Sequence, residues 1–388
     1  MRKLTVSAPG RLCLFGEHMD WCGHKVLACA VDMRIFVEAE AMQGNVVEVS
    51  SFSPFTTKDV FNLENISWDP HSDLRYIGGV LKAFQKKNDL PYTIRGAKTR
   101  LLRAEEAQKK LEHEHTKKEF KDLPVSKGLS SSAAMCVAIS AAIDLAHRFQ
   151  DAVPDNRSSI VNYVSKPETS TFYADMAYTG ERKELGVNCG QMDQYASAFG
   201  GILHIDCTVE PAKVNRLKPR ASLPLVIGDT RQPKDTPKVL GWLGERFKAK
   251  EPKFIEGMKS IIKIVEAAKN ELEKQSPSHQ KIGELMNENQ HYLKNYLRIS
   301  GDCPVSPSRL DEIIDAYLKA GALGAKLSGS GGGGCMIALC EPGDETKIAR
   351  AIYEAGGEAH ITKVADQGVR IESLDFYFNT FLPLGFYY

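Results

Sequence analysis

Three serines in the run Gly128-Leu-Ser-Ser-Ser-Ala-Ala134 stand at the start of an apolar segment. That segment, residues 135–149, is rich in Ala, Val, Ile and Leu and predicts a helix. The first amides of a helix lack partners within it, and the helix dipole favours an anion at that end. We expect a nucleotide phosphate at this helix start, because Gly128 also lets the backbone approach a ligand. The alternative is that Ser130 to Ser132 only cap a core helix.

A second glycine-rich run, Ser328-Gly-Ser-Gly-Gly-Gly-Gly334, contains the pattern GxGxxG. A helix is expected before it and a strand after it, which is the reverse of the order in a dinucleotide fingerprint. The chain has no Gly-Lys pair, which excludes a P-loop. We interpret the run as a loop that faces a bulky ligand, and a plain tight turn is the alternative.

Two further segments carry charged side chains between glycines. In Gly16-Glu-His-Met-Asp20 the side chains of Glu17, His18 and Asp20 could converge on a polyhydroxylated ligand through charge-assisted hydrogen bonds. A solvated turn is the alternative there. The segment Cys189-Gly-Gln-Met-Asp193-Gln adds one carboxylate in a loop, which by itself indicates no particular chemistry.

The elements that must position these segments follow from apolar periodicity. Residues 4–6 and 12–14 predict strands around a turn at Pro9-Gly10, and residues 26–31 and 35–40 predict further short elements. Residues 95–121 are dense in charges of both signs and predict a solvated, partly helical excursion. Helices are expected over 68–82, 254–274, 281–297 and 308–321, and strands over 200–206 and 335–340. Proline punctuation after residue 210 predicts two domains, 1–215 and 216–388.

Composition narrows the class of protein. A chain of 388 residues suits about two domains, and a net charge of +1 gives no field that would attract nucleic acid. No stretch approaches the ~18 apolar residues of a membrane span, and the N-terminus has no apolar signal core. Nine cysteines without a CxxC pair argue against a zinc knuckle or a disulfide framework. We therefore expect a cytoplasmic protein without nucleic-acid or membrane partners.

Taken together and in order, these motifs resemble those of the GHMP small-molecule kinases. The matching segments are Pro9-Gly-Arg11 with Gly16-Glu-His-x-Asp20, Gly128 to Ala134, and Lys326-Leu-Ser-Gly-Ser-Gly-Gly-Gly-Gly334. The resemblance implies an α+β fold of two domains, the first similar to ribosomal protein S5 domain 2 and the second an α/β domain. It also implies ATP and Mg²⁺, with the nucleotide between the domains.

Within that superfamily several positions are similar to galactokinase, and the resemblance implies their roles. Asp193 would take the proton of the accepting hydroxyl, and Arg11 would keep that carboxylate ionised. Ser132 and Glu181 would hold Mg²⁺. The acceptor would contact Glu17, His18, Asp20 and Gly190. The nucleotide would contact Gly128, Leu129, Ser130, Ser131, Ser132, Ala133 and Ala134, with Gly329, Ser330 and Gly331 closing over its phosphates.

Other segments depart from galactokinase. Gly23-His-Lys-Val-Leu-Ala28 replaces its usual continuation, and Gly228-Asp-Thr230 is nearer to mevalonate kinase. The leading prediction is an ATP-dependent kinase that acts at the anomeric hydroxyl of a monosaccharide. Galactose is the default acceptor, and a uronic acid, arabinose or an amino sugar are the alternative sugars. The alternatives are a mevalonate-type alcohol kinase and a sugar sensor without catalysis. Monomer and homodimer both remain open.

Overall fold

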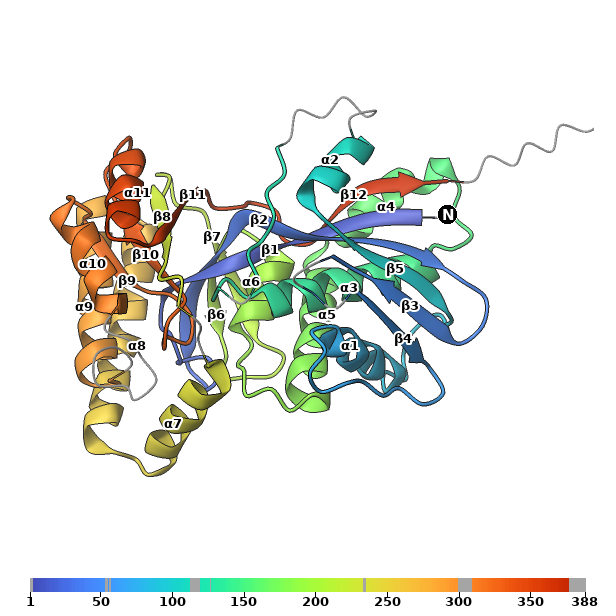
Figure 1. Ribbon diagram of the computed structural model, residues 1–388, viewed down its shortest axis with the longest axis horizontal. Helices are drawn as coiled ribbons and strands as arrows, with labels where there is room; N and C mark the ends of the chain where they lie inside the picture. Colours follow the sequence, from blue (N-terminus) through green and yellow to red (C-terminus); the bar gives the residue numbers. More distant parts are fainter. Residues whose placement is uncertain are drawn as a thin grey trace, which may run out of the picture.

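The protein consists of two β-sheets with their helices, lying side by side in Figure 1. This computed structural model describes residues 3–52, 55, 57–111, 119–125, 127–232, 235–298 and 309–376. Both sheets combine with helices, which confirms the α+β class expected from the resemblance. Among the described residues, no helix is long and apolar enough to cross a membrane.

The larger sheet has the strand order β12-β1-β2-β5-β3-β4, and β6 and β7 extend it from the first half of β2. Its strands are β1 (Lys3–Phe15), β2 (Lys25–Ala41), β3 (Val46–Ser50), β4 (Lys58–Asn62), β5 (Ala97–Leu102), β6 (Ile202–Asp206), β7 (Lys213–Leu217) and β12 (Arg370–Asp375). Helix α3 (Ser131–Arg148) packs on β1 and β2. The other helices of this part are α1 (Arg75–Gln85), α2 (Ala104–Leu111), α4 (Arg157–Val164), α5 (Pro167–Tyr178) and α6 (Met192–Phe199).

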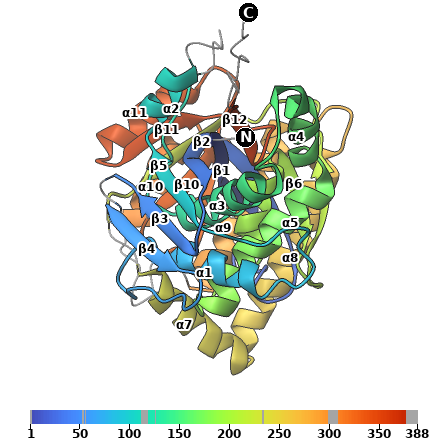
Figure 2. The ribbon, with the colours of Figure 1, turned by 90° about the vertical axis from the view of Figure 1, so that its right-hand side faces the viewer.

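The smaller sheet is antiparallel, with the order β11-β8-β10-β9. Its strands are β8 (Leu225–Asp229), β9 (Gly324–Leu327), β10 (Cys335–Leu339) and β11 (Glu358–Thr362). The helices with it are α7 (Thr236–Lys248), α8 (Pro252–Leu272), α9 (His279–Asn295), α10 (Arg309–Lys319) and α11 (Glu345–Glu354). Helix α9 packs on both α8 and β9, while α7 lies at the lower edge of the molecule in Figure 1 and Figure 2.

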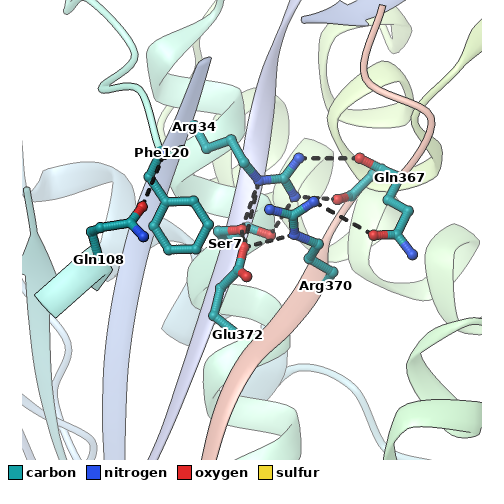
Figure 3. Close-up of polar contacts among 8 residues, drawn as sticks. Ser7, Arg34, Gln108, Phe120, Gln367, Arg370 and Glu372 are labelled. Atoms are coloured by element: carbon teal, nitrogen blue, oxygen red, sulfur yellow. Dashed lines mark hydrogen bonds and ion pairs between the residues drawn. The ribbon is translucent and has the colours of Figure 1, made fainter. Parts of the chain in front are cut away.

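The last strand returns to the first sheet, which the expected division at residue 215 did not foresee. β12 pairs with β1, and β7 runs across the expected boundary. A buried polar cluster fixes this return (Figure 3): Arg34 Nε donates to Ser7 Oγ at 2.7 Å and Nη1 donates to the Gln367 carbonyl at 3.1 Å. Ser7 Oγ in turn donates to Glu372 Oε1 at 2.5 Å. The residues after 215 therefore complete the first sheet as well as forming the second.

The turn expected at Pro9-Gly10 is wrong, because β1 continues through it. The pairing of β1 with β2 shifts in register between Pro9 and Arg11 instead of reversing direction. A Cβ on Gly10 would lie 2.3 Å from Leu123 Cδ1 and 2.8 Å from the Leu129 carbonyl oxygen. Gly10 thus lets the strand pass close to the loop at residues 128–134. The two short elements expected over 26–31 and 35–40 are likewise one strand, β2.

The charged segment 95–121 also differs from its interpretation as a solvated excursion. Residues 97–102 form β5, in which Ala97, Thr99 and Leu101 are buried while Lys98 and Arg100 are exposed. This alternation is the signature of a half-buried strand, which the charge content concealed. Helix α2 confirms the helical part, and residues 112–118 lie outside the described residues.

The expected helices agree with the structure, except that one of them begins later in the chain than expected. α3, α8, α9 and α10 lie where apolar periodicity placed them, within a few residues at each end. The helix expected from residue 68 begins only at Arg75. Side chains of Asp69 and Ser72 accept hydrogen bonds from the backbone N–H of His71 and Leu74, respectively. These local turns compete with helix formation before residue 75.

Candidate active site

Arg11 and Asp193 form the centre of the site. Arg11 Nε donates to Asp193 Oδ1 at 2.6 Å and Nη2 donates to Oδ2 at 2.9 Å, a bidentate pair between β1 and the first turn of α6. Burial acts to lower the pKa of Arg11, but the charge and the hydrogen bonds of Asp193, together with smaller contributions from Cys13 and Asp20, outweigh it and raise that pKa. The Arg11 side chain is almost sealed, whereas a quarter of the Asp193 side chain remains exposed. The carboxylate is therefore paired with a cation, held in one orientation and open on one side.

The small-residue loop meets this pair directly. Ser130 has a left-handed backbone with φ of 59°, and its Oγ donates to Asp193 Oδ2 at 2.6 Å. Arg11 Nη1 donates to the Gly128 carbonyl at 2.8 Å. Ser130 therefore contacts the carboxylate instead of capping α3, which begins at Ser131. Ala133 and Ala134 are buried against the core.

The second glycine run lies against the first. Gly329 and the four glycines from Gly331 to Gly334 all have positive φ, a conformation that side chains disfavour. A Cβ on Gly329 would lie 3.2 Å from the Gly128 carbonyl oxygen and 3.9 Å from Arg11 Nη1. Ser330 Oγ lies 3.2 Å from Thr236 Oγ1. The run is a wide loop that adjoins the expected phosphate-binding loop, residues 128–134. Five glycines with positive φ are more than a tight turn requires.

Asp229, the last residue of β8, and Thr230 after it join these loops. Lys127 Nζ lies 2.6 Å from Asp229 Oδ2, an ion pair that links the residue before Gly128 to the smaller sheet. Thr230 donates to the Gly334 carbonyl through its backbone N–H at 3.1 Å and its hydroxyl at 3.2 Å. The segment Gly228-Asp-Thr230 can be recognised in the sequence, but its contact with Gly334 cannot.

Ser132 and Glu181 lie together as expected for metal-binding residues. Glu181 is buried in a π-helical turn, Thr179–Glu184, and its carboxylate accepts a hydrogen bond from the Ser132 side chain. Burial raises the pKa of Glu181 to about 7. No group of three or more His, Cys, Asp and Glu forms a metal site among the described residues. An ion held by this hydroxyl and carboxylate would take its remaining ligands from phosphates and water, which suits Mg²⁺.

Asp20 and Gly190 are in direct contact. A Cβ on Gly190 would lie 2.1 Å from Asp20 Oδ2, so only glycine fits there. The Asp20 carboxylate accepts hydrogen bonds from the backbone N–H of Trp21 and Met192. Burial and the nearby charge of Asp193 raise the pKa of Asp20 to about 6. Two carboxylates thus lie near one another, Asp193 with a cationic partner and Asp20 with backbone donors.

His18 and Glu17 lie deeper than the sequence suggested. His18 has a φ of 69°, and its Nδ1 accepts a hydrogen bond from Trp21 Nε1 at 3.1 Å. Glu17 forms an ion pair with Lys326 in which both side chains are 0 % exposed. Lys326 Nζ also donates to the Cys13 carbonyl at 3.1 Å. Lys326 and the surrounding core thus enclose Glu17, and its contact with the acceptor stays a prediction.

A cavity of about 280 Å³ lies next to Lys127, the residue before the expected phosphate-binding loop. Its lining combines apolar side chains with a few polar ones: Arg34, Ile35, Phe52, Leu101, Leu102, Arg103, Asp122, Leu123, Pro124, Val125 and Lys127. The Arg103 guanidinium lies 4.5 Å from the centre of the Phe52 ring. A larger cavity, about 700 Å³, opens between α7 and α8 and contains none of the expected site residues. The larger cavity is therefore separate from the expected site residues.

Family models match three parts of the chain. The GHMP kinases N terminal domain matches residues 76–201, the GHMP kinases C terminal matches residues 264–358, and the galactokinase galactose-binding signature matches residues 2–41. A mevalonate kinase of Thermococcus onnurineus is 32 % identical over 379 residues, which cover 96 % of this chain and 99 % of that protein. The chain belongs to the GHMP kinases. Its family transfers phosphate from ATP to an alcohol group.

Two kinds of GHMP kinase are similar to this one along most of its length. The mevalonate kinase of Pyrococcus abyssi is 30 % identical and covers 96 % of the chain, and a galactokinase of Haemophilus influenzae is 25 % identical and covers 95 %. The chain covers 99 % and 95 % of those two proteins, respectively. The structure of Lactococcus lactis galactokinase complexed with galactose has a TM-score of 0.68 at 20 % identity and covers 95 % of this chain, which covers 94 % of that one. This GHMP kinase therefore has the same fold as galactokinase.

Proposed function

We propose that this GHMP kinase transfers the γ-phosphate of ATP to a monosaccharide hydroxyl at the anomeric carbon, with galactose or a related sugar as acceptor. The observation that carries the proposal is the approach of Asp20 to Asp193. Mevalonate is a carboxylate, and a second acidic side chain beside the base disfavours an anionic acceptor. A neutral sugar can instead donate its hydroxyl protons to Asp20. The match of residues 2–41 to the galactose-binding signature supports the same choice.

Each residue then has a chemical role. Asp193 accepts the proton of the attacking hydroxyl, and its open side is where that hydroxyl would lie. Arg11 keeps Asp193 ionised and offsets charge on the transferring phosphoryl group. Amides at the start of α3 and the glycines from Gly329 onward bind the phosphates. Phosphoryl transfer needs mainly positioning and charge neutralisation, which these groups supply.

Mg²⁺ fits the pairing of Ser132 with Glu181. Bound there with the nucleotide, it would neutralise charge on the phosphates. We assign the base of the nucleotide to the cavity lined by Phe52 and Val125, because that cavity is mainly apolar and its lining includes Lys127, the residue before Gly128. The cytoplasm, where ATP is available, is the proposed location, and the eight described cysteines are all unpaired.

A mevalonate-type acceptor is the second candidate. It is favoured by the identity of 30–32 % to mevalonate kinases of Pyrococcus and Thermococcus and by the segment Gly228-Asp-Thr230, which is nearer to mevalonate kinase than to galactokinase. A coupled ADP-release assay with Mg-ATP separates the two. The acceptors are galactose, N-acetylgalactosamine, galacturonate, glucuronate, arabinose, fucose and mevalonate.

We expect turnover on a neutral sugar, with a product that has lost its reducing end. Turnover on mevalonate alone would overturn the argument from Asp20. ATP binding without turnover on any of these compounds would favour a sugar sensor, which the intact Arg11–Asp193 pair argues against.

A further inference from the structure

Gln194 follows the proposed base directly and is buried to 1 % exposure in α6. Its amide nitrogen Nε2 donates to Glu181 Oε2 at 2.5 Å and to Cys189 Sγ at 3.8 Å. An amide nitrogen carries two protons, so these two acceptors use both of them. The nitrogen therefore faces Glu181 and Cys189, and the oxygen of the same amide points away from both acceptors.

The other atom of the same amide, Oε1, is buried and has no hydrogen-bond partner in the part of the chain that the structure describes. A buried amide oxygen without a donor or a cation destabilises the fold, so native proteins rarely leave one. The oxygen and the nitrogen of an amide are bonded to the same carbon atom. Since the nitrogen contacts Glu181, the oxygen also lies near the Glu181 carboxylate. An unused oxygen thus lies beside the expected metal-binding residues.

We propose that Gln194 Oε1 is the third protein oxygen of the metal site that includes Ser132 and Glu181. This inference rests on the proposed kinase function, since it concerns the cation that accompanies the nucleotide. Mg²⁺ and Mn²⁺ prefer carboxylate, carbonyl and water oxygens, and an amide oxygen is a neutral ligand of this class. Gln194 therefore both holds Glu181 by its nitrogen and contributes to the site by its oxygen.

Two variants separate these two contributions. Gln194→Met removes the donor and the oxygen while keeping a similar volume. Gln194→Glu keeps an oxygen and removes the donor. Gln191→Met is the matched control: Gln191 is also buried in the same region, but its Nε2 donates to the Val209 carbonyl at 3.1 Å and its Oε1 accepts from Ala212 N–H at 3.0 Å.

The measurement is the affinity of the full chain for Mn²⁺ in the presence of ADP at pH 8, by electron paramagnetic resonance, with no acceptor present. We expect Gln194→Met to weaken Mn²⁺ binding by about tenfold or more, the usual effect of removing a group that supports a metal site. Gln194→Glu should bind Mn²⁺ as tightly as the wild type or more tightly, because it supplies a charged oxygen. Gln191→Met should lower the melting temperature and leave the Mn²⁺ affinity unchanged.

Two results would overturn the inference. Gln194→Met that binds Mn²⁺ like the wild type would show that the amide has no part in the site. Equal weakening in Gln194→Met and Gln194→Glu would mean that the amide acts only by donating to Glu181. A wild-type chain that binds no Mn²⁺ with ADP would contradict the kinase proposal itself, which distinguishes that failure from a failure of the role of Gln194.

Discussion

Two buried pairs of opposite charge lie near the end of β1, and they differ in exposure. In the first, Arg11 holds Asp193 through two hydrogen bonds, and a quarter of the Asp193 side chain remains exposed. In the second, Lys326 holds Glu17 with both side chains fully enclosed. Both consist of a cation and a carboxylate, and both carboxylates come from segments that resemble a substrate site. Only the first leaves a carboxylate edge that another molecule can reach.

The second pair connects the two sheets. Lys326 belongs to β9 of the smaller sheet. Its two partners come from the larger sheet: the Cys13 carbonyl lies near the end of β1, and Glu17 follows that strand. The backbone N–H of Cys13 donates to Ser328 Oγ at 3.1 Å, and that of Gly16 donates to Asn289 Oδ1 at 3.2 Å. Enclosure therefore separates the two pairs: a charged pair sealed between two sheets fixes their relative position, and a partly open one can take part in chemistry.

The largest effect should come from the open pair. Asp193→Asn keeps the size of the side chain but removes the proton acceptor, so we expect phosphoryl transfer to fall by about 10³-fold or more. ADP release with the best acceptor measures the rate, and titration with ATP measures nucleotide affinity, which should change little. Transfer at the wild-type rate would remove Asp193 from the role of base.

The closed pair should respond in stability instead. Glu17→Met and Lys326→Met each leave one buried charge unpaired, and each should lower the free energy of unfolding by about 3–5 kcal/mol. The double variant should lose less than the sum, because neither charge then remains. Denaturant unfolding of the four proteins measures this coupling. Strictly additive losses, or a Glu17→Met variant of normal stability and poor acceptor affinity, would return Glu17 to the acceptor site.

Arg11→Ala tests whether the cation of the open pair acts on the transferring group. We expect kcat to fall by about 10²-fold, because a charge that stabilises the transition state is lost. The Kd for ADP should change much less. The two quantities come from steady-state rates and from nucleotide titration. A loss of nucleotide affinity as large as the loss of kcat would indicate that Arg11 serves only to shape the phosphate loop.

The smallest effect concerns Asp20 and its pH dependence. Its pKa is raised to about 6 in the folded protein, from an ordinary value of 3.8, so ionisation is disfavoured in the folded state. Ionisation of Asp20 therefore lowers the free energy of unfolding. This destabilisation is absent below pH 4 and complete above about pH 7. Two pKa units correspond to roughly 3 kcal/mol at most, and partial exposure to water reduces this.

Asp20→Asn cannot ionise and avoids that destabilisation. The variant should therefore be more stable than the wild type at pH 8, by about 1–2 kcal/mol, and similar to it near pH 4. Chemical denaturation at both values of pH measures the difference. An equal effect at the two values would mean that the carboxyl of Asp20 does not titrate in this range.

Some of the fold was predictable because its signals are local. Helices α8, α9 and α10 follow from apolar positions that recur every three or four residues. Strand β5 was missed because Lys98 and Arg100 suggested a solvated segment, although they only occupy its exposed side. The turn at Pro9-Gly10 was wrong because the close approach of Leu123 and Leu129, which requires Gly10, comes from a distant segment.

The sequence by itself determined the chemistry that is available: the residues of the phosphate loop, the second glycine run, and the carboxylates of Asp193 and Glu181. These are readable because glycine conformations and clustered hydroxyl or charged groups are properties of short segments. Only the tertiary structure decided which carboxylate is open. Lys326 lies 309 positions from Glu17, and desolvation depends on everything that packs around a charge, which no short segment contains.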